Sequence, residues 1–122
     1  MKPEKMKYIY ALLVVILDWD DTVFPSSYLV ATGHGLEEPH IEATVLAELQ
    51  VLEEVASRFL LEIQKHATCV IVTNAEAGWV ELSAARFMPK LASVVNKLRI
   101  VSARTTYERY YPDSPVDWKV RT

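Results

Sequence analysis

The pattern of apolar positions along the chain alternates between two periods. An apolar run from Tyr8 to Leu17 ends directly before Asp18, and a second apolar, β-rich run spans Thr68 to Thr73. Between them, apolar residues recur every three or four positions from His40 to about His66, the spacing of one helix face. The pattern therefore predicts two strands joined by a long amphipathic helix.

The remaining residues continue this alternation. Asn74 can cap a helix that runs to about Met88, and a further helical stripe leads to a short strand from Arg99 to Ser102. Ser114-Pro115 is typical of the start of a last helix. This order favours a parallel sheet with right-handed crossovers. We predict an α/β fold with a single core domain over residues 1–122, a three-layer sandwich with a mainly parallel, Rossmann-like sheet.

The first apolar run predicts a strand and not a membrane span or a signal peptide. It is about half as long as the ~20 residues that a membrane span requires, and carboxylates follow it where a cleavage site needs small residues. From Ala11 to Leu17 it is apolar at successive positions, which favours a central strand covered on both faces. A loop rich in helix breakers is expected from Thr22 to Pro39.

Composition and charge narrow the classes of function. The 122 residues are 51% hydrophobic and 24% charged, enough for one sizeable core. A net charge of −3 gives no reason to expect a nucleic-acid partner, and no membrane partner is expected either. The single Cys69 lies in an apolar run and cannot form an internal disulfide, so we expect a buried thiol and a cytoplasmic location.

Three carboxylates follow the first predicted strand, on Asp18, Asp20 and Asp21. They repel one another, so a cation, hydrogen bonds or solvent must hold them ionised, and Mg²⁺ is the simplest partner. A calcium-binding loop that starts at Asp18 would need Gly and Glu where the chain has Val23 and Leu29. The calcium loop is excluded, and an acidic strand end without a ligand remains the alternative.

Three short motifs resemble those of the haloacid dehalogenase superfamily of hydrolases. They are Asp18-x-Asp20-x-Thr22 after the first strand, Thr73-Asn74 after the second, and Lys119 near the start of the last helix. The resemblance covers about Tyr8 to Lys119. The span between the first two motifs has no room for a separate cap domain, and capless members of that superfamily tend to act on macromolecules or use a neighbouring subunit as a lid.

The resemblance implies a Mg²⁺-dependent phosphatase with an aspartate nucleophile. Asp18 would attack phosphorus, and Asp20 would protonate the leaving group and then activate water. Lys119 would neutralise the nucleophile and the phosphate oxygens, and Thr73 would bind phosphoryl oxygens at a helix N-terminus. Asp18 and Asp20, the latter through a backbone carbonyl nearby, would hold Mg²⁺. The implied substrate-binding residues are Thr22, Thr73 and Asn74.

The sequence departs from the superfamily pattern after Lys119. A fourth motif, an acid at the end of a further strand, completes the metal site in that superfamily, and the sequence has no room for such a strand before Thr122. We therefore expect a weak or incomplete Mg²⁺ site, in either a truncated form or a naturally short member. The alternatives are an inactive binding or dimerisation module and, less well matched, a phosphoacceptor receiver domain.

The missing strand has a consequence for assembly. The strand from Tyr8 to Leu17 would keep one unpaired edge, and it carries no Pro or charge that would blunt this edge. We therefore expect a homo-oligomer.

The segment from Ser26 to Glu38 would form a flap over the site, in which His34 is expected to be exposed. Residues that follow the second motif at helical spacing are expected in the core, namely Trp79, Phe87 and Met88.

Overall fold

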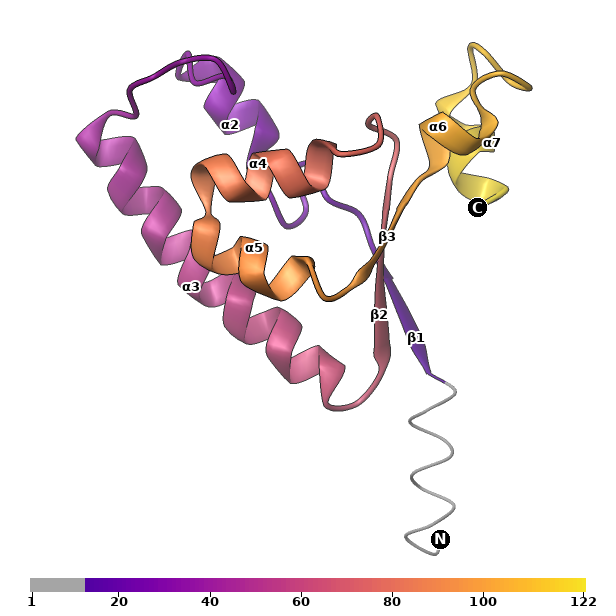
Figure 1. Cartoon of the computed structure of the whole chain (residues 1–122), viewed down its shortest axis with the longest axis horizontal. Coiled ribbons are helices and arrows are strands. Elements are labelled where there is room, and N and C mark those ends of the chain that lie inside the picture. Colours follow the sequence, from indigo (N-terminus) through magenta and orange to yellow (C-terminus); the bar gives the residue numbers. More distant parts are fainter. Residues whose placement is uncertain (1–12) are drawn as a thin grey trace, which may run out of the picture.

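The structure, a computed structural model, describes residues 13–122 and is of mixed α/β type (Figure 1). Its strands are all parallel and lie side by side in chain order: β1 (Val14–Leu17), β2 (Thr68–Thr73) and β3 (Arg99–Ser102). The part of the predicted first strand that precedes residue 13 lies outside the described residues. The helices are α2 (Ser26–Ala31), α3 (Ala43–Gln64), α4 (Trp79–Phe87), α5 (Pro89–Val95), α6 (Ala103–Tyr107) and α7 (Pro115–Val120).

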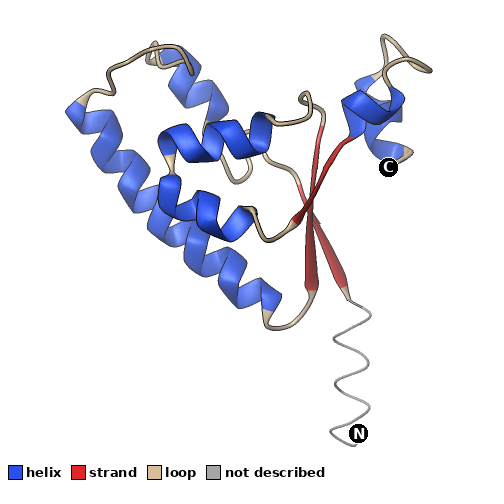
Figure 2. Ribbon diagram, viewed as in Figure 1, coloured by secondary structure: helices blue, strands red, loops and turns tan. Residues whose placement is uncertain are grey.

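The main core lies between one face of the sheet and helices α3, α4 and α5 (Figure 2). Alternate residues of a strand point to opposite faces, so Ile71 enters this core while Val70 and Val72 belong to the other side. Ile71, Leu60 and Leu91 are fully buried. Each such side chain contributes roughly 1.5–3 kcal/mol by leaving water. This packing fixes the direction of the strands and thereby the position of their carboxyl ends.

Helices α6 and α7 lie on the opposite side of the sheet, near the carboxyl ends of the strands (Figure 1). A smaller cluster forms there around Val72, Ala103 and Trp118. The rest of this face is open. It forms the floor of a groove of about 680 Å³ that extends from β1 to Lys119.

The prediction that the first strand is covered on both faces is wrong for its described residues. Val14 and Ile16 are 56% and 69% exposed, because the helices on their side of the sheet cover only its upper end. Within residues 13–122, β1 pairs with β2 alone, so its other edge is free. The unpaired edge that we expected is therefore present in this part of the chain.

The segment predicted as a loop from Thr22 to Pro39 contains helix α2. The loop prediction is wrong here because the Asp21 carboxylate accepts hydrogen bonds from the backbone N–H and the hydroxyl of Ser27, and so supports the first turn of α2. The prediction that His34 is exposed is also wrong, because this side chain is buried, with only 7% of its surface exposed. Its Nε2 accepts the backbone N–H of Glu42 at 3.2 Å, and this contact ties the loop to the start of α3.

The helix predicted to follow a cap at Asn74 begins only at Trp79, after Gly78. The Thr73 hydroxyl oxygen accepts the backbone N–H of Ala75 at 3.0 Å, a local turn that competes with a helix. Gly78, with φ of 95°, then precedes the first helical residue. The strand bounds of β2 and β3 and the start of α7 agree with the sequence prediction, and Cys69 is buried as expected.

Candidate functional site

Asp18 and Lys119 lie together at the carboxyl end of the sheet. Asp18 follows β1 directly, and Lys119 lies in α7. The Nζ atom of Lys119 is 2.5 Å from Oδ1 of Asp18, although the residues are 101 positions apart. The Thr22 hydroxyl lies 3.4 Å from the other oxygen, Oδ2. Three of the predicted site residues therefore meet in one place.

The Asp20 carboxylate is held by a different pair of donors. The indole Nε1–H of Trp79 donates to Oδ1 of Asp20 at 2.9 Å, and the Ser26 hydroxyl donates to the same oxygen. Ser26 is the first residue of α2 and Trp79 the first of α4. Two helices thus fix the orientation of this carboxylate, while its Oδ2 accepts no hydrogen bond from the described residues.

The residue between the two aspartates is anchored in the core. Trp19 is fully buried, stacks on Phe24 at a ring distance of 5.5 Å, and donates its indole N–H to Ser83. Its carbonyl accepts backbone N–H groups of the following turn, including that of Phe24. Its two neighbours, Asp18 and Asp20, are half-buried.

The third carboxylate of the cluster is hydrogen-bonded to Ser27. Asp21 adopts a left-handed φ of 57°, and its oxygens bind the backbone N–H and hydroxyl of Ser27. The hydrogen bonds from Ser27 lower the pKa of the Asp21 carboxyl. Each of the three carboxylates therefore has its own donors, which explains how the fold accommodates three neighbouring negative charges.

The second motif lies beside the first but not at a helix N-terminus. Thr73 is 1% exposed, and its hydroxyl oxygen accepts the N–H of Ala75. The prediction that Thr73 lies at the start of a helix is wrong, because α4 begins six residues later, at Trp79. The amide oxygen of Asn74 is buried and has no hydrogen-bond partner among the described residues. Phosphate binding by these two residues stays a prediction.

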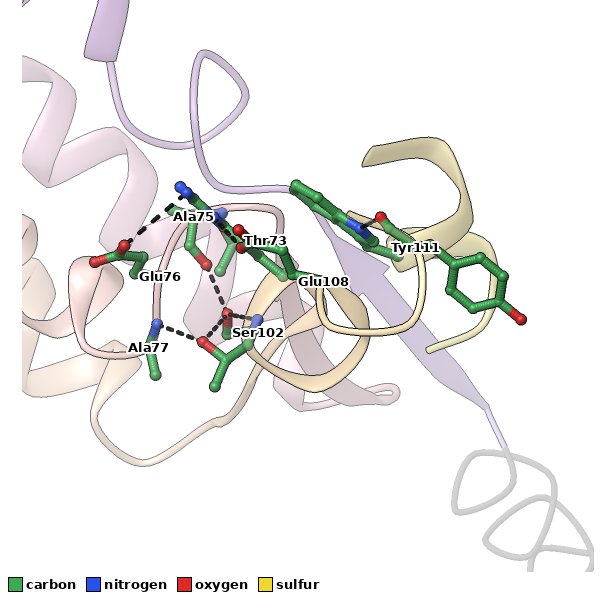
Figure 3. Close-up of polar contacts among 10 residues, drawn as sticks. Thr73, Ala75, Glu76, Ala77, Ser102, Glu108 and Tyr111 are labelled. Atoms are coloured by element: carbon green, nitrogen blue, oxygen red, sulfur yellow. Dashed lines mark hydrogen bonds and ion pairs between the residues drawn. The ribbon is translucent and has the colours of Figure 1, made fainter. Parts of the chain in front are cut away.

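The loop after β2 is attached to the end of β3, as Figure 3 shows. The Ser102 hydroxyl donates to the carbonyl of Ala75 at 2.6 Å, and the backbone N–H of Ala77 donates to the Thr105 hydroxyl at 3.1 Å. Ser102 and Thr105 also bond each other at 2.9 Å. No sequence motif marks these two residues, which fix the second motif relative to the neighbouring strand end.

The oxygen atoms that follow β1 are of the type that binds a hard cation such as Mg²⁺, but there are few of them. Residues 13–122 contain no group of three or more His, Cys, Asp or Glu side chains that could hold a metal ion. Asp117, a further acid near Lys119, accepts the hydroxyl of Ser114. The donors that fit Mg²⁺ are the carboxylate of Asp18 and the backbone carbonyl of Asp20, which accepts no backbone hydrogen bond in the described part. Magnesium binding remains a prediction.

Trp79 and Ser26 are the site residues that the sequence analysis missed. Phe87 and Met88 are buried as predicted, at 4% and 0% exposure, whereas Trp79 is half-buried and directs its N–H to Asp20. Helical periodicity predicted that Trp79, Phe87 and Met88 all lie in the core. Such a period indicates which side of a helix is apolar, but it does not indicate where the one polar atom of a large ring points.

Comparisons with protein-family models, with curated proteins and with solved structures found no match. Among the described residues no helix combines the length and the apolar character needed to cross a membrane. The fold and the site define a mixed α/β protein with a carboxylate–lysine pair at the carboxyl end of a parallel sheet.

Proposed function

We propose that the protein is a phosphoryl-transfer hydrolase of the haloacid dehalogenase type, a Mg²⁺-dependent phosphatase in which Asp18 is the nucleophile. The observation that carries the proposal is the 2.5 Å contact between Lys119 and Asp18, with Asp20 held separately two residues away. In open parallel sheets ligands bind beyond the carboxyl ends of the strands, where these residues lie. The parallel order β1-β2-β3 supports the Rossmann-like, three-layer reading of the fold.

The two aspartates divide the reaction between them. A carboxylate oxygen of Asp18 attacks the phosphorus of a phosphate monoester, and the bond to the leaving oxygen breaks as Asp20 donates a proton to it. Asp20 then takes a proton from water, which attacks the aspartyl phosphate and releases inorganic phosphate and free Asp18. The positive charge of Lys119 stabilises the negative charge on the phosphoryl oxygens. Mg²⁺ bound at Asp18 would supply further charge neutralisation.

The expected substrate is a phosphorylated group that is accessible from outside, such as one carried by a macromolecule. The described elements between Asp18 and β2 are α2 and α3, so no separate domain stands between these two strand ends.

A cytoplasmic location accords with Cys69, which is free and 3% exposed. Burial also raises the pKa of its thiol, which keeps it protonated and unreactive.

The test is hydrolysis of a generic aryl phosphate in Mg²⁺ by the wild type and two matched variants. Asp18→Asn should abolish turnover, because an amide cannot act as the nucleophile. Asp21→Asn should retain it, because Asp21 binds Ser27 and not the neighbouring aspartates. Beryllofluoride should bind the wild type but not Asp18→Asn. Wild-type protein without hydrolysis and without beryllofluoride binding would contradict the proposal.

The second candidate is an inactive module that binds a partner or a second copy. The observation that favours it is the open face of the sheet, where Val14 and Ile16 are largely exposed and the groove reaches Lys119. If the wild type neither hydrolyses phosphate esters nor binds beryllofluoride, the inactive module becomes the favoured function.

A further inference from the structure

The orientation of Asp20 depends on two donors that come from separate helices. The Ser26 hydroxyl and the Trp79 indole N–H both donate to Oδ1, so the carboxylate cannot rotate without losing two hydrogen bonds at once. These donors leave the other oxygen of Asp20, Oδ2, as the one available to exchange a proton. A proton-transfer group must hold its reacting oxygen within hydrogen-bond reach of the substrate, and a fixed rotamer meets that condition.

The Trp79 ring is itself held by the core. It packs edge-on against Phe24 at a ring distance of 6.1 Å and an interplanar angle of 87°. Phe24 is 1% exposed and stacks on Trp19, the residue between the two aspartates. The apolar side of the indole is therefore anchored while its polar atom reaches the half-buried carboxylate. A positioned donor of this kind holds the carboxylate in place before substrate arrives.

We infer that Trp79, assisted by Ser26, is a positioning residue that sets the rotamer of Asp20 for proton transfer. The inference rests on the proposed function and adds a contribution from α4 to the reaction. Trp79 also begins the helix that follows the Thr73-Asn74 loop, so it connects the second motif to the proton-transfer group. Loss of its N–H should affect the chemical step and not substrate binding.

The kinetic test uses Trp79→Phe, which keeps an aromatic ring against Phe24 and removes the donor. We expect kcat to fall by about 10- to 100-fold, as for the loss of a hydrogen bond to a charged group, with KM unchanged. Ser26→Ala removes the second donor with little change in volume and should lower kcat in the same way. Unchanged kcat in both variants, with an active wild type, would overturn the inference and leave the proposed function standing.

The matched control is Ser83→Ala. Ser83 lies in the same helix as Trp79, is fully buried, and its hydroxyl oxygen accepts the indole N–H of Trp19 at 3.0 Å. Its loss should lower the thermal midpoint without the selective loss of kcat. An equal fall in kcat in Ser83→Ala would mean that any weakening of α4 reduces turnover, and would overturn the positioning role.

A spectroscopic test separates this inference from the proposed function. The indole N–H resonance of Trp79 should move in Asp20→Asn, which removes the charge it faces, and should stay in place in Asp21→Asn. A Trp79 resonance that does not respond to Asp20→Asn would overturn the inference whether or not the protein hydrolyses phosphate esters. A responsive resonance in a protein that neither hydrolyses phosphate esters nor binds beryllofluoride would support the contact and contradict the proposed function.

Discussion

The ion pair of Lys119 and Asp18 is half-exposed, with 34% and 42% of the two side chains accessible. Solvent screens a pair of this kind, so it stabilises the fold by less than about 1 kcal/mol. In the proposed reaction its effect would be larger, because the ammonium group holds one carboxylate oxygen and places a positive charge where phosphoryl oxygens would lie. Activity and stability should therefore respond differently to the loss of this lysine.

Lys119→Met should lower kcat/KM for an aryl phosphate by at least about 100-fold and leave the thermal midpoint within a few degrees of the wild type. Lys90→Met is the matched control, because Lys90 forms a similar ion pair with Glu54 at 2.7 Å, between helices α5 and α3. This control should keep full activity. Equal losses of activity in the two variants would show that Lys119 acts only through the fold.

Asp21 influences a whole element, since it supports the first turn of α2 in a left-handed conformation that Asp and Asn tolerate better than most residues. Hydrogen bonds from Ser27 lower its pKa relative to the unfolded chain. A lowered pKa means that the stabilisation is present above the unfolded value near 4 and is lost as the pH falls through the folded value.

Asp21→Asn should therefore lower the thermal midpoint at about pH 7, and the difference from the wild type should shrink as the pH falls below about 4 and the Asp21 carboxyl becomes protonated. Thermal unfolding followed by circular dichroism over this pH range measures the difference. A gap of constant size at every pH would mean that the charge of Asp21 does not support α2.

Elements with a long, regular pattern were predictable from the sequence. The period of three to four predicted α3, an apolar, β-rich run predicted β2, and β3 was predicted as a short strand after a helical stripe. Helix α2 was missed because six residues are too few to establish a period. The predicted start of α4 was wrong because the local turn at Thr73 replaces the first turn of the expected helix. At the site, Asp18 after β1 lies next to Lys119 of α7, as the resemblance implied, whereas the Trp79 contact depends on a ring orientation that no sequence pattern encodes.

At the scale of the whole molecule, β1 combines a free edge with an open apolar face in the described part of the chain. An edge strand without charge or Pro is a template for pairing with another chain. A second copy related by a twofold axis presents the same edge, so β1 can pair with its equivalent and extend the sheet. We expect self-association at micromolar concentration.

Ile16→Lys should weaken this self-association, because it places a charge on the open face next to the edge. Val51→Lys is the matched control, since Val51 in α3 is 68% exposed and Ile16 is 69% exposed. Sedimentation velocity should show a dimer or larger species for the wild type and for Val51→Lys, and a smaller species for Ile16→Lys. A wild type that stays monomeric at this concentration would contradict the expectation.

The contact of Lys119 with Asp18 also determines when the site comes into being. It closes a loop of 101 positions, and the segments between its ends include β2, β3 and most of the helices. A contact this distant in sequence carries a high entropic cost until the intervening structure has condensed. During synthesis, Asp18 leaves the ribosome about a hundred residues before its partner, so the nascent chain carries the carboxylates without the lysine. We therefore expect the pair to form late in folding, so that the proposed nucleophile meets its lysine only in chains that have completed the fold.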